Sequence, residues 1–374
     1  MLNSNVLATL ADLIRINSIN PAYDDGRPES HIADYIERFF SERGIETWRQ
    51  EVLPDRPNLI ARLPGRNSGR RVVLEAHVDT ASITGMTIPP FEPEVRDHRM
   101  YGRGSCDTKA GLAAMMHAVA SLHADGAKPE CEVWMVAAAD EEYSFRGVTR
   151  LCEGLQADAA IVAEPTELRA IIASKGVLRW KVRTHGKAAH SSKPALGVNA
   201  IVKMAKVIQL FEQSAAELTR RHPLLGVATQ NIGVIRGGVQ INFVPDWCEI
   251  EIDRRLLPGE TAAAVLAGYE SLLAGLDLAV TMDPPMLVDE ALETAANSSV
   301  AQTASGVLRD MGLNSELAGV PYGSDASKLS RHGVPSIIFG PGSIDQAHAA
   351  VEYVECEQVL RAEEFYRQFL LRFP

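Results

Sequence analysis

Three short, almost wholly apolar segments constrain the fold of this chain more than any other feature of its sequence. They cover residues 72–76, 133–139 and 159–163, and each ends directly before a histidine or an acidic residue. Apolar runs of this length are typical of strands that are covered on both faces. Stretches with helical spacing separate them, so we expect an α/β fold with a mostly parallel mixed sheet flanked by helices.

The first of these strands ends at His77-Val78-Asp79, where the two polar side chains leave the strand on the same side. An imidazole that binds a metal commonly gives its second ring proton to a carboxylate, which fixes its orientation and raises its basicity. A motif this short, taken alone, favours an ordinary surface loop. Its meaning therefore depends on what the other strand ends supply.

The other strand ends supply further candidate metal ligands. Glu141 and Glu142 follow the second apolar segment, and Glu164 follows the third. Ligands of parallel sheets gather at the carboxyl ends of the strands. Asp107 stands just before a predicted helix, and a loop near the C-terminus holds a further histidine. We expect one edge of the sheet to collect five ligands, namely His77, Asp107, Glu142, Glu164 and His348.

This set of two imidazoles and three carboxylates suits a pair of divalent metal ions. One carboxylate would bridge the ions, and each ion would have a nitrogen and a carboxylate of its own. The charge of two divalent ions exceeds that of three carboxylates by about one unit, which favours hydroxide and an anionic intermediate. Nitrogen and oxygen ligands favour two Zn²⁺, with Co²⁺ or Mn²⁺ as substitutes. Glu141 cannot reach the atom that Glu142 binds, so it is free to accept a proton from the attacking water.

Composition and charge argue against several other classes of function. The chain has 374 residues and a net charge of -11 without any basic stripe, so we expect no nucleic-acid partner. We expect a cytoplasmic protein without a membrane partner, because no apolar run approaches a membrane span and Met1–Ile19 is patterned as an amphipathic helix. The five cysteines are scattered without a CxxC pair, which disfavours disulfides and a thiolate zinc site.

A change of pattern near Lys175 indicates a second domain, as expected for a chain of this length. The order strand, helix, strand, strand, helix, strand then runs to about Pro284, which predicts an inserted ferredoxin-like α+β domain. Beyond it, two helices and a buried strand return to the first domain. The sequence therefore predicts a catalytic domain over residues 1–174 and 285–374 and an inserted domain over residues 175–284.

As a set, the motifs resemble a known family. In chain order they are His77-Val78-Asp79, Gly102 to Lys109, Asp140-Glu141-Glu142, Ala163-Glu164-Pro165, Gly186 to His190, Gly340-Pro341-Gly342 and Ala347-His348. This series resembles the di-zinc metallopeptidase family that contains acetylornithine deacetylase, succinyl-diaminopimelate desuccinylase, aminoacylase and carboxypeptidase G. The similarity extends from about His77 to His348, and the set is far more specific than any one motif.

The resemblance implies how two zinc ions would be bound. One ion would be held by His77 and Glu164, and the other by Glu142 and His348. Asp107 would bridge the two ions. The fold would be zinc-exopeptidase-like, with a cis peptide bond directly after the bridging aspartate.

The resemblance also assigns catalytic roles. Glu141 would be the general base, and Asp79 would orient the neighbouring histidine ligand. His190, in a loop of the inserted domain, would donate to the reacting carbonyl oxygen, often across a dimer. The inserted domain would act as a lid and form the homodimer. Without the resemblance, His190 is best interpreted as a surface histidine.

Four further residues would contact the substrate if the resemblance holds. Asn242 and Arg255 would bind its carboxylate, for which a guanidinium is the natural bidentate partner. Gly323 and Ser324 would belong to a substrate-facing loop. The residues alone equally allow a strand-edge amide, a solvated arginine and a helix cap at these positions.

These expectations describe a metal-dependent amide hydrolase that removes the acyl group from an N-acyl amino acid, with acetylornithine as the first candidate. Within the same family, the alternatives are a succinyl-diaminopimelate desuccinylase and a di- or carboxypeptidase acting on short peptides. The alternative from another class is a non-catalytic amino-acid-binding or scaffold homologue. Loss of Glu141 or of a ligand would mark such a homologue, and all six of these residues are present.

Overall fold

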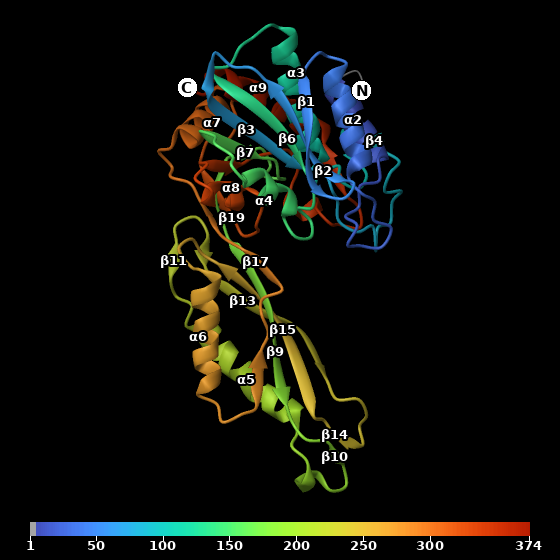
Figure 1. Ribbon diagram of the computed structural model, residues 1–374, viewed down its shortest axis with the longest axis vertical. Helices are drawn as coiled ribbons and strands as arrows, with labels where there is room; N and C mark the ends of the chain where they lie inside the picture. The colour runs from blue at the N-terminus through green and yellow to red at the C-terminus, as the bar shows by residue number, and fades with distance from the viewer. Residues whose placement is uncertain (1–4) are drawn as a thin grey trace. The chain divides into compact units, whose positions relative to one another are not determined.

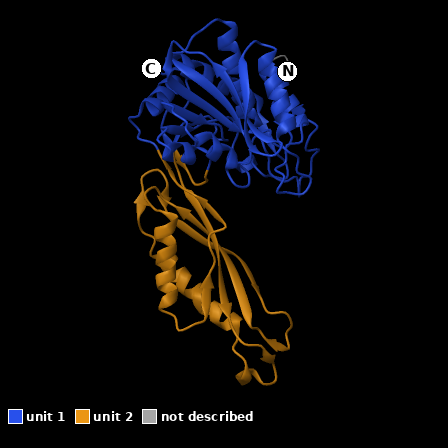
Figure 2. Cartoon of the chain, viewed as in Figure 1, with its two compact units in different colours: residues 1–172, 294–318, 324–374 blue, residues 173–293, 319–323 orange. Residues whose placement is uncertain are grey.

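The structure, a computed structural model, describes residues 5–374 and divides the chain into two compact units (Figure 2). Unit 2 comprises Ala173–Glu293 and Gly319–Gly323. Unit 1 comprises Thr294–Ala318, Ser324–Pro374 and the described residues up to Ile172. Unit 1 is thus assembled from segments that lie on both sides of unit 2 in the sequence.

A mixed sheet lies at the centre of unit 1, in the order β1-β2-β6-β3-β7-β20-β8, and the short strands β18 and β19 pair with β8 (Figure 1). The strands are β1 (Glu46–Leu53), β2 (Arg56–Leu63), β3 (Asn67–His77), β6 (Cys131–Ala138), β7 (Ala159–Val162), β8 (Ile171–Ser174), β18 (Leu292–Glu293), β19 (Ala318–Val320) and β20 (Ser336–Ile338). Strands β6, β3, β7 and β20 are mutually parallel, whereas β1, β2 and β8 are antiparallel to their neighbours. The predicted fold class is confirmed, because the three apolar segments form β3, β6 and β7 at the parallel centre.

Helices cover both faces of this sheet. They are α1 (Asn5–Arg15), α2 (Ser30–Ser41), α3 (Lys109–Ala124), α4 (Arg146–Cys152), α7 (Ser299–Asp310), α8 (Ala326–Arg331), α9 (Cys356–Arg372) and the short 3-10 helix η2 (Ile344–Gln346). Helices α1, α2, α3, α7 and α9 share one core with Val72, Leu74 and Ala76 of β3. Because side chains alternate along a strand, His77 points to the opposite face, where α4 and α8 contact each other. No helix among residues 5–374 is long and apolar enough to cross a membrane.

The N-terminal helix is shorter than the sequence pattern predicts. We expected a helix from Met1 to Ile19, but α1 ends at Arg15, and residues 1–4 lie outside the described part of the chain. Beyond the helix, the side chain of Asn17 accepts a hydrogen bond from the amide of Ile19, which replaces a helical bond. Ile19 then forms a bridge with Thr80, just after β3. This change of direction brings Asn20 close to the end of β3.

A small three-stranded sheet joins two loops of unit 1 that are far apart in the sequence. It has the order β21-β5-β4, with β4 (Glu94–Arg96), β5 (Arg99–Tyr101) and β21 (Tyr353–Glu355). Met100 of β5 lies opposite Val354 of β21 in an antiparallel pair. The segment that precedes Asp107 therefore lies beside the segment that follows His348.

Unit 2 has an antiparallel sheet in the order β13-β15-β9-β16, with β17 also paired to β9 (Figure 1). Its elements are β9 (Gly176–His185), β10 (Ala189–His190), η1 (Pro194–Leu196), α5 (Ala200–Ala216), β11 (Arg221–His222), β12 (Gly226–Val227), β13 (Thr229–Gly237), β14 (Phe243–Val244), β15 (Trp247–Leu256), α6 (Ala262–Ala274), β16 (Val280–Met282) and β17 (Leu287–Asp289). Both helices pack on one face around Trp180, Phe211 and Tyr269. The predicted ferredoxin-like order is present as β9, α5, β13, β15, α6 and β16.

Candidate metal centre

Three neighbouring parallel strands bring their carboxyl ends to one edge of the sheet. His77 is the last residue of β3 and lies opposite Ala138, the last residue of β6. Glu141 and Glu142 follow β6 directly, and Glu164 follows β7 on the other side of β3. The strand order therefore gathers these side chains as the sequence predicts, although no two of the three strands are joined by a short turn.

Asp107 lies between the two candidate histidine ligands. Its Oδ1 is 3.1 Å from Nε2 of His77, and its Oδ2 is 3.3 Å from Nε2 of His348. A carboxylate that directs one oxygen to each of two imidazoles has the arrangement expected of a bridging ligand. The peptide bond that follows, Asp107-Thr108, is cis.

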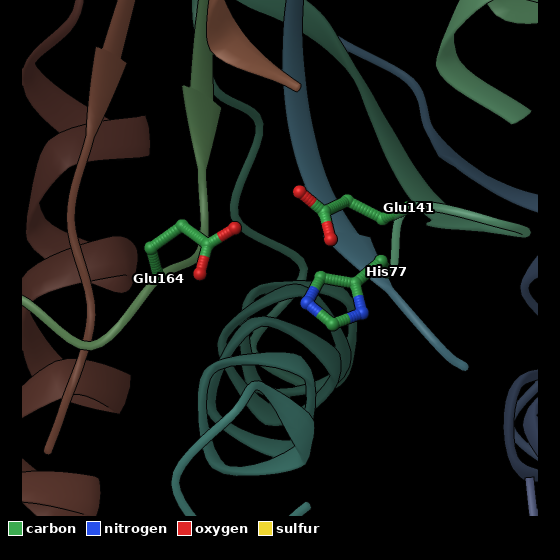
Figure 3. Close-up of side chains that lie close together, drawn as sticks. All are labelled: His77, Glu141 and Glu164. Atoms are coloured by element: carbon green, nitrogen blue, oxygen red, sulfur yellow. The ribbon is translucent and has the colours of Figure 1, made fainter. Parts of the chain in front are cut away.

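Two groups of three residues offer ligand atoms that lie within 4.8 Å of one another. The first group is His77, Glu141 and Glu164, whose side chains point toward one another from three strand ends (Figure 3). The second group is Asp107, Glu142 and His348. In the second group, Nε2 of His348 is 3.1 Å from Oε2 of Glu142.

The five predicted ligands and Glu141 are thus divided between two adjacent groups. The first group is well covered by protein, since the side chain of His77 is only 2% exposed. The second is more open, because the His348 side chain is 57% exposed. A centre with one covered and one open side gives a small substrate access to the ligands without admitting bulk water to all of them.

The electrostatics of this site favour bound cations. Burial raises the pKa values of the Glu141, Glu164 and Glu142 carboxyls, and neighbouring carboxylates raise them further. Hydrogen bonds to Asp107 and Glu142 raise the pKa of His348 to about 10. Buried carboxylates that resist ionisation lack compensating positive charge, which divalent ions would supply. The donor set therefore fits two metal ions with mixed nitrogen and oxygen ligands.

The orientation of His77 is set by its own strand end. Nδ1 of His77 is 3.0 Å from the backbone carbonyl oxygen of Asp79, whereas the Asp79 carboxylate is 3.7 Å away. A proton on Nδ1 can therefore be donated to this carbonyl, which leaves Nε2 free as a ligand atom. The Asp79 carboxylate itself accepts hydrogen bonds from the backbone amides of Glu141 and Glu142, both at 3.1 Å. The Asp79 carboxylate therefore contacts the loop of Glu141 and Glu142 more closely than it contacts the His77 ring.

Sequence reasoning missed Asn20, a buried residue that connects this loop to the N-terminal segment. Its side-chain nitrogen donates to Oδ2 of Asp79 at 2.7 Å and to Oδ1 of Asp140 at 2.9 Å. Arg56 also pairs with Asp140, at 2.8 Å, and with the buried Glu29. The only sequence signal for Asn20 is its place before a proline at the end of a helical pattern, which predicts a turn and no catalytic role.

In unit 2, the structure brings together His190 and Asn242. His190 lies in β10, which pairs with β14, and the amide of Ser191 donates to the carbonyl oxygen of Asn242 at 3.0 Å. Both His190 and Asn242 are exposed. Nδ1 of His190 accepts a hydrogen bond from the backbone amide of Ser192 at 3.2 Å. The neutral imidazole therefore carries its proton on Nε2, the nitrogen that remains free to donate.

Arg254 and Arg255, which the sequence alone does not distinguish, have different environments in unit 2. Arg254 is 2% exposed and pairs with Glu260 at 3.0 Å. Arg255 is 29% exposed and pairs with Asp253 at 2.7 Å. Of the two guanidinium groups, that of Arg255 is therefore the one within reach of a ligand.

The expected substrate-facing loop is tightly packed. Ser324 is fully buried, and its hydroxyl accepts a hydrogen bond from the amide of Ala326 at the start of α8. An added Cβ on Gly323 would lie 1.8 Å from Oδ2 of Asp289, so no side chain fits there. The Ser324 hydrogen bond is typical of a turn that precedes a helix, and the assignment of Gly323 and Ser324 to a substrate-facing loop stays a prediction.

Comparison with known proteins finds a matching family and similar sequences. Residues 73–372 match the sequence model of Peptidase family M20/M25/M40. The chain is 30% identical to acetylornithine deacetylase of Myxococcus xanthus, over 98% of this chain and 97% of that protein.

Solved structures share the fold. Aminopeptidase PepT of Bacillus cereus has a TM-score of 0.81 at 22% identity, over 98% of this chain and 97% of that chain. A dinuclear metal binding peptidase of the M20 family from Bacillus subtilis has a TM-score of 0.74 at 18% identity, over 98% and 96% of the two chains. The match of residues 73–372 to the family model shows that the chain belongs to peptidase family M20/M25/M40.

Proposed function

We propose that this protein is a two-metal amide hydrolase that removes the acyl group from an N-acyl amino acid, in the manner of an acetylornithine deacetylase. The observation that carries the proposal is the Asp107 carboxylate, which directs one oxygen to each of two imidazoles beside the adjacent pair Glu141 and Glu142. Such a carboxylate bridge is typical of two-metal hydrolases.

The metal ligands in this proposal are residues of unit 1. His77 and Glu164 would hold one ion, Glu142 and His348 the other, and Asp107 both. Two Zn²⁺ fit this donor set, and Co²⁺ or Mn²⁺ would substitute. When bound, the ions supply a Lewis acid for the amide carbonyl and lower the pKa of the attacking water.

Glu141 is the proposed general base. Glu141 is not needed as a ligand in this proposal, since the shared Asp107 would be the third ligand both for the ion at His77 and Glu164 and for the ion at Glu142 and His348. Its carboxylate lies beside His77 and Glu164 (Figure 3), and the hydrogen bond from its amide to Asp79 fixes its loop. In this role Glu141 accepts a proton from the attacking water and then delivers it to the leaving amine nitrogen.

Unit 2 supplies the proposed substrate contacts. His190 donates from Nε2 to the oxygen of the reacting carbonyl, a role supported by the hydrogen bond of Ser192 to its other ring nitrogen. Arg255 and Asn242 bind the free carboxylate of the amino acid. The Asp253 carboxylate beside Arg255 keeps the guanidinium oriented before a substrate arrives.

We assign these contacts to two chains of a homodimer. His190 and Asn242 lie next to the start of β15, while Arg255 is eight residues along it, about 25 Å away at the rise of an extended strand. No N-acyl amino acid spans that length, so one substrate meets His190 of one chain and Arg255 of the other. Exposed apolar side chains near β10 and β14 also favour an interface, among them Leu196, Val202, Val239 and Ile241.

Substrate choice is the finer part of the proposal. The relative from Myxococcus xanthus supports acetylornithine as the first candidate. A succinyl-diaminopimelate desuccinylase is the second candidate, and a di- or carboxypeptidase the third. Each of these substrates has a free carboxylate for Arg255. We place the protein in the cytoplasm.

An assay of zinc-loaded protein against N-acetyl, N-succinyl and dipeptide substrates tests this proposal. We expect turnover of N-acetylated amino acids, with N-acetylornithine giving the highest kcat/KM. Rates at the level of the metal-free protein for every substrate would contradict the hydrolase assignment. Preference for a succinyl amide or a dipeptide would retain the mechanism and change the substrate.

A further inference from the structure

Glu352 is a fully buried carboxylate that contacts the loop of the bridging aspartate. Its Oε1 accepts hydrogen bonds from the backbone amides of Cys106 at 2.9 Å and Asp107 at 3.1 Å. Its Oε2 accepts from the Gly104 amide at 3.1 Å and from Nη1 of Arg103 at 2.6 Å. Four donors from one five-residue segment thus converge on one side chain, which is 0% exposed.

The loop from Gly102 to Asp107 is shaped around this carboxylate. Gly104 has a φ of +80°, and an added Cβ would lie 2.9 Å from Lys109 and from Thr80, so only glycine fits. This conformation turns the amides of three residues toward one point, as in the backbone nests that bind anions. The position of Asp107 therefore depends on the anion at that point.

Glu352 is also tied to the other ligand of the same group. It lies four residues after His348, and its own carbonyl oxygen accepts from the Gly102 amide at 3.1 Å. The pairing of β21 with β5 continues this contact. One side chain therefore fixes the distance between the segment that carries His348 and the loop that carries Asp107.

Arg103 extends the connection to the segment after β3. Its Nη2 donates to the carbonyl oxygen of Ser82 at 2.7 Å, and its backbone amide donates to the carbonyl oxygen of Pro90 at 2.8 Å. Its guanidinium is 2% exposed and balances the charge of Glu352. Removal of one partner from a buried ion pair leaves an uncompensated charge, which strongly destabilises the structure around it.

Glu352 does not belong to either group of candidate ligands among residues 5–374. Glu352 acts by positioning Asp107 and His348, which are two of the three members of the second group. The members of the first group, His77, Glu141 and Glu164, are held by the ends of β3, β6 and β7. Loss of Glu352 should therefore weaken the site at Glu142 and His348 more, because that site loses the placement of two ligands, Asp107 and His348, whereas the site at His77 and Glu164 loses only that of the shared Asp107.

We propose that Glu352 is a positioning residue that sets the affinity of the metal site formed by Asp107, Glu142 and His348, and has much less effect on the site at His77 and Glu164. This inference rests on the proposed two-metal function. It assigns Glu352 a part in the metal centre, which its burial alone does not reveal.

Glu352→Gln tests the proposal with little change in volume. Both carboxylate oxygens accept hydrogen bonds, so an amide must turn its NH₂ group against one pair of N–H donors. We expect one metal ion per chain to bind with nearly wild-type affinity, and the dissociation constant of the second to rise about 10- to 100-fold. The matched control is Glu355→Gln, which removes a carboxylate three residues away, at the end of β21, where it pairs with Arg99 at 2.7 Å.

The measurement is a titration of metal-free protein with Zn²⁺, repeated with Co²⁺ so that the visible absorption of each site is seen as it fills. Two unaltered binding steps in Glu352→Gln would overturn the proposal, and so would equal weakening of both steps. Fewer than two ions in the wild type would instead contradict the proposed function. If Glu352→Gln does not fold, Glu352→Asp decides, because it keeps the charge, shortens the reach and should again weaken the second step more than the first.

Discussion

At the scale of single residues, Asn20 separates two buried carboxylates that would otherwise repel each other. It donates to Asp79 and to Asp140, and all three residues are at most 1% exposed. The isosteric change Asn20→Asp replaces the donor by a third carboxyl. We expect it to lower the free energy of unfolding at neutral pH by about 3 kcal/mol, the range for an uncompensated buried charge.

Chemical denaturation of the metal-free protein at pH 7 and pH 5 measures this effect. The defect should shrink at the lower pH, because the added carboxyl then takes up a proton. Asn17→Asp is the matched control, since Asn17 is only half-buried and its side-chain nitrogen donates only a 3.3 Å bond, to the Asp25 carbonyl oxygen, while the oxygen that accepts from the Ile19 amide is kept in aspartate. Equal stability of the two variants would show that the contacts of Asn20 are unimportant.

The residues that the sequence predicts well are those in short motifs next to strand ends. His77, Glu142 and Glu164 need only a parallel sheet to meet, and the apolar segments predict that sheet. Asn20 and Glu352 could not be found in this way, because their partners lie 59 and about 245 residues away. Such contacts follow from tertiary packing and leave no local pattern of spacing.

At the scale of elements, His117 links three helices of unit 1. It lies in α3, its Nε2 is 2.8 Å from Oγ1 of Thr9 in α1, and its ring contacts Phe39 of α2 with centroids 5.1 Å apart. Burial, assisted by the charge of Arg43, lowers the pKa of His117 to about 4. The unfolded chain therefore binds this proton more tightly than the folded chain does.

Stability should fall as the pH drops from about 6.5, the ordinary pKa of histidine, toward 4. Because His117 is partly exposed, we expect a loss on the order of 1 kcal/mol between pH 7 and pH 5 from this group. His117→Gln should remove that part of the pH dependence, whereas His332→Gln, at an exposed position, should retain it. The same slope in all three proteins would rule out His117 as the cause.

The elements themselves follow their sequence patterns closely, and α1 is the exception. Its pattern continues to Ile19, yet the helix ends at Arg15 because Asn17 and the bridge to Thr80 replace the helical bonds. Hydrophobic spacing predicts which face is buried and not where a turn begins. The antiparallel strands β1 and β2 at the sheet edge likewise depend on pairing that no single segment encodes.

At the scale of the whole molecule, the proposed function requires two chains for one reaction. Glu141→Gln should inactivate the active site in the chain that carries the substitution. His190→Ala should inactivate the active site of the other chain in the dimer. Mixing the two inactive variants after subunit exchange should restore about a quarter of wild-type activity, since half of the dimers then contain one intact combination.

The control is each variant mixed with itself, which should stay inactive. If mass spectrometry detects mixed dimers but activity does not recover, His190 and Glu141 of the same chain act on one substrate. The sequence could not decide this point, because the separation of about 25 Å between His190 and Arg255, about eight strand residues, appears only once β10 is paired with β14, just before the start of β15.

The two-metal mechanism with Glu141 as general base is tested most directly when bound metal and hydrolysis are measured together, in the wild type and in Glu141→Gln. We predict about two divalent ions per chain in both proteins. Hydrolysis should be slower by about 10²- to 10⁴-fold in the variant, because the proton acceptor is lost while every ligand remains. Full activity in Glu141→Gln, or in wild-type protein stripped of metal, would contradict this mechanism.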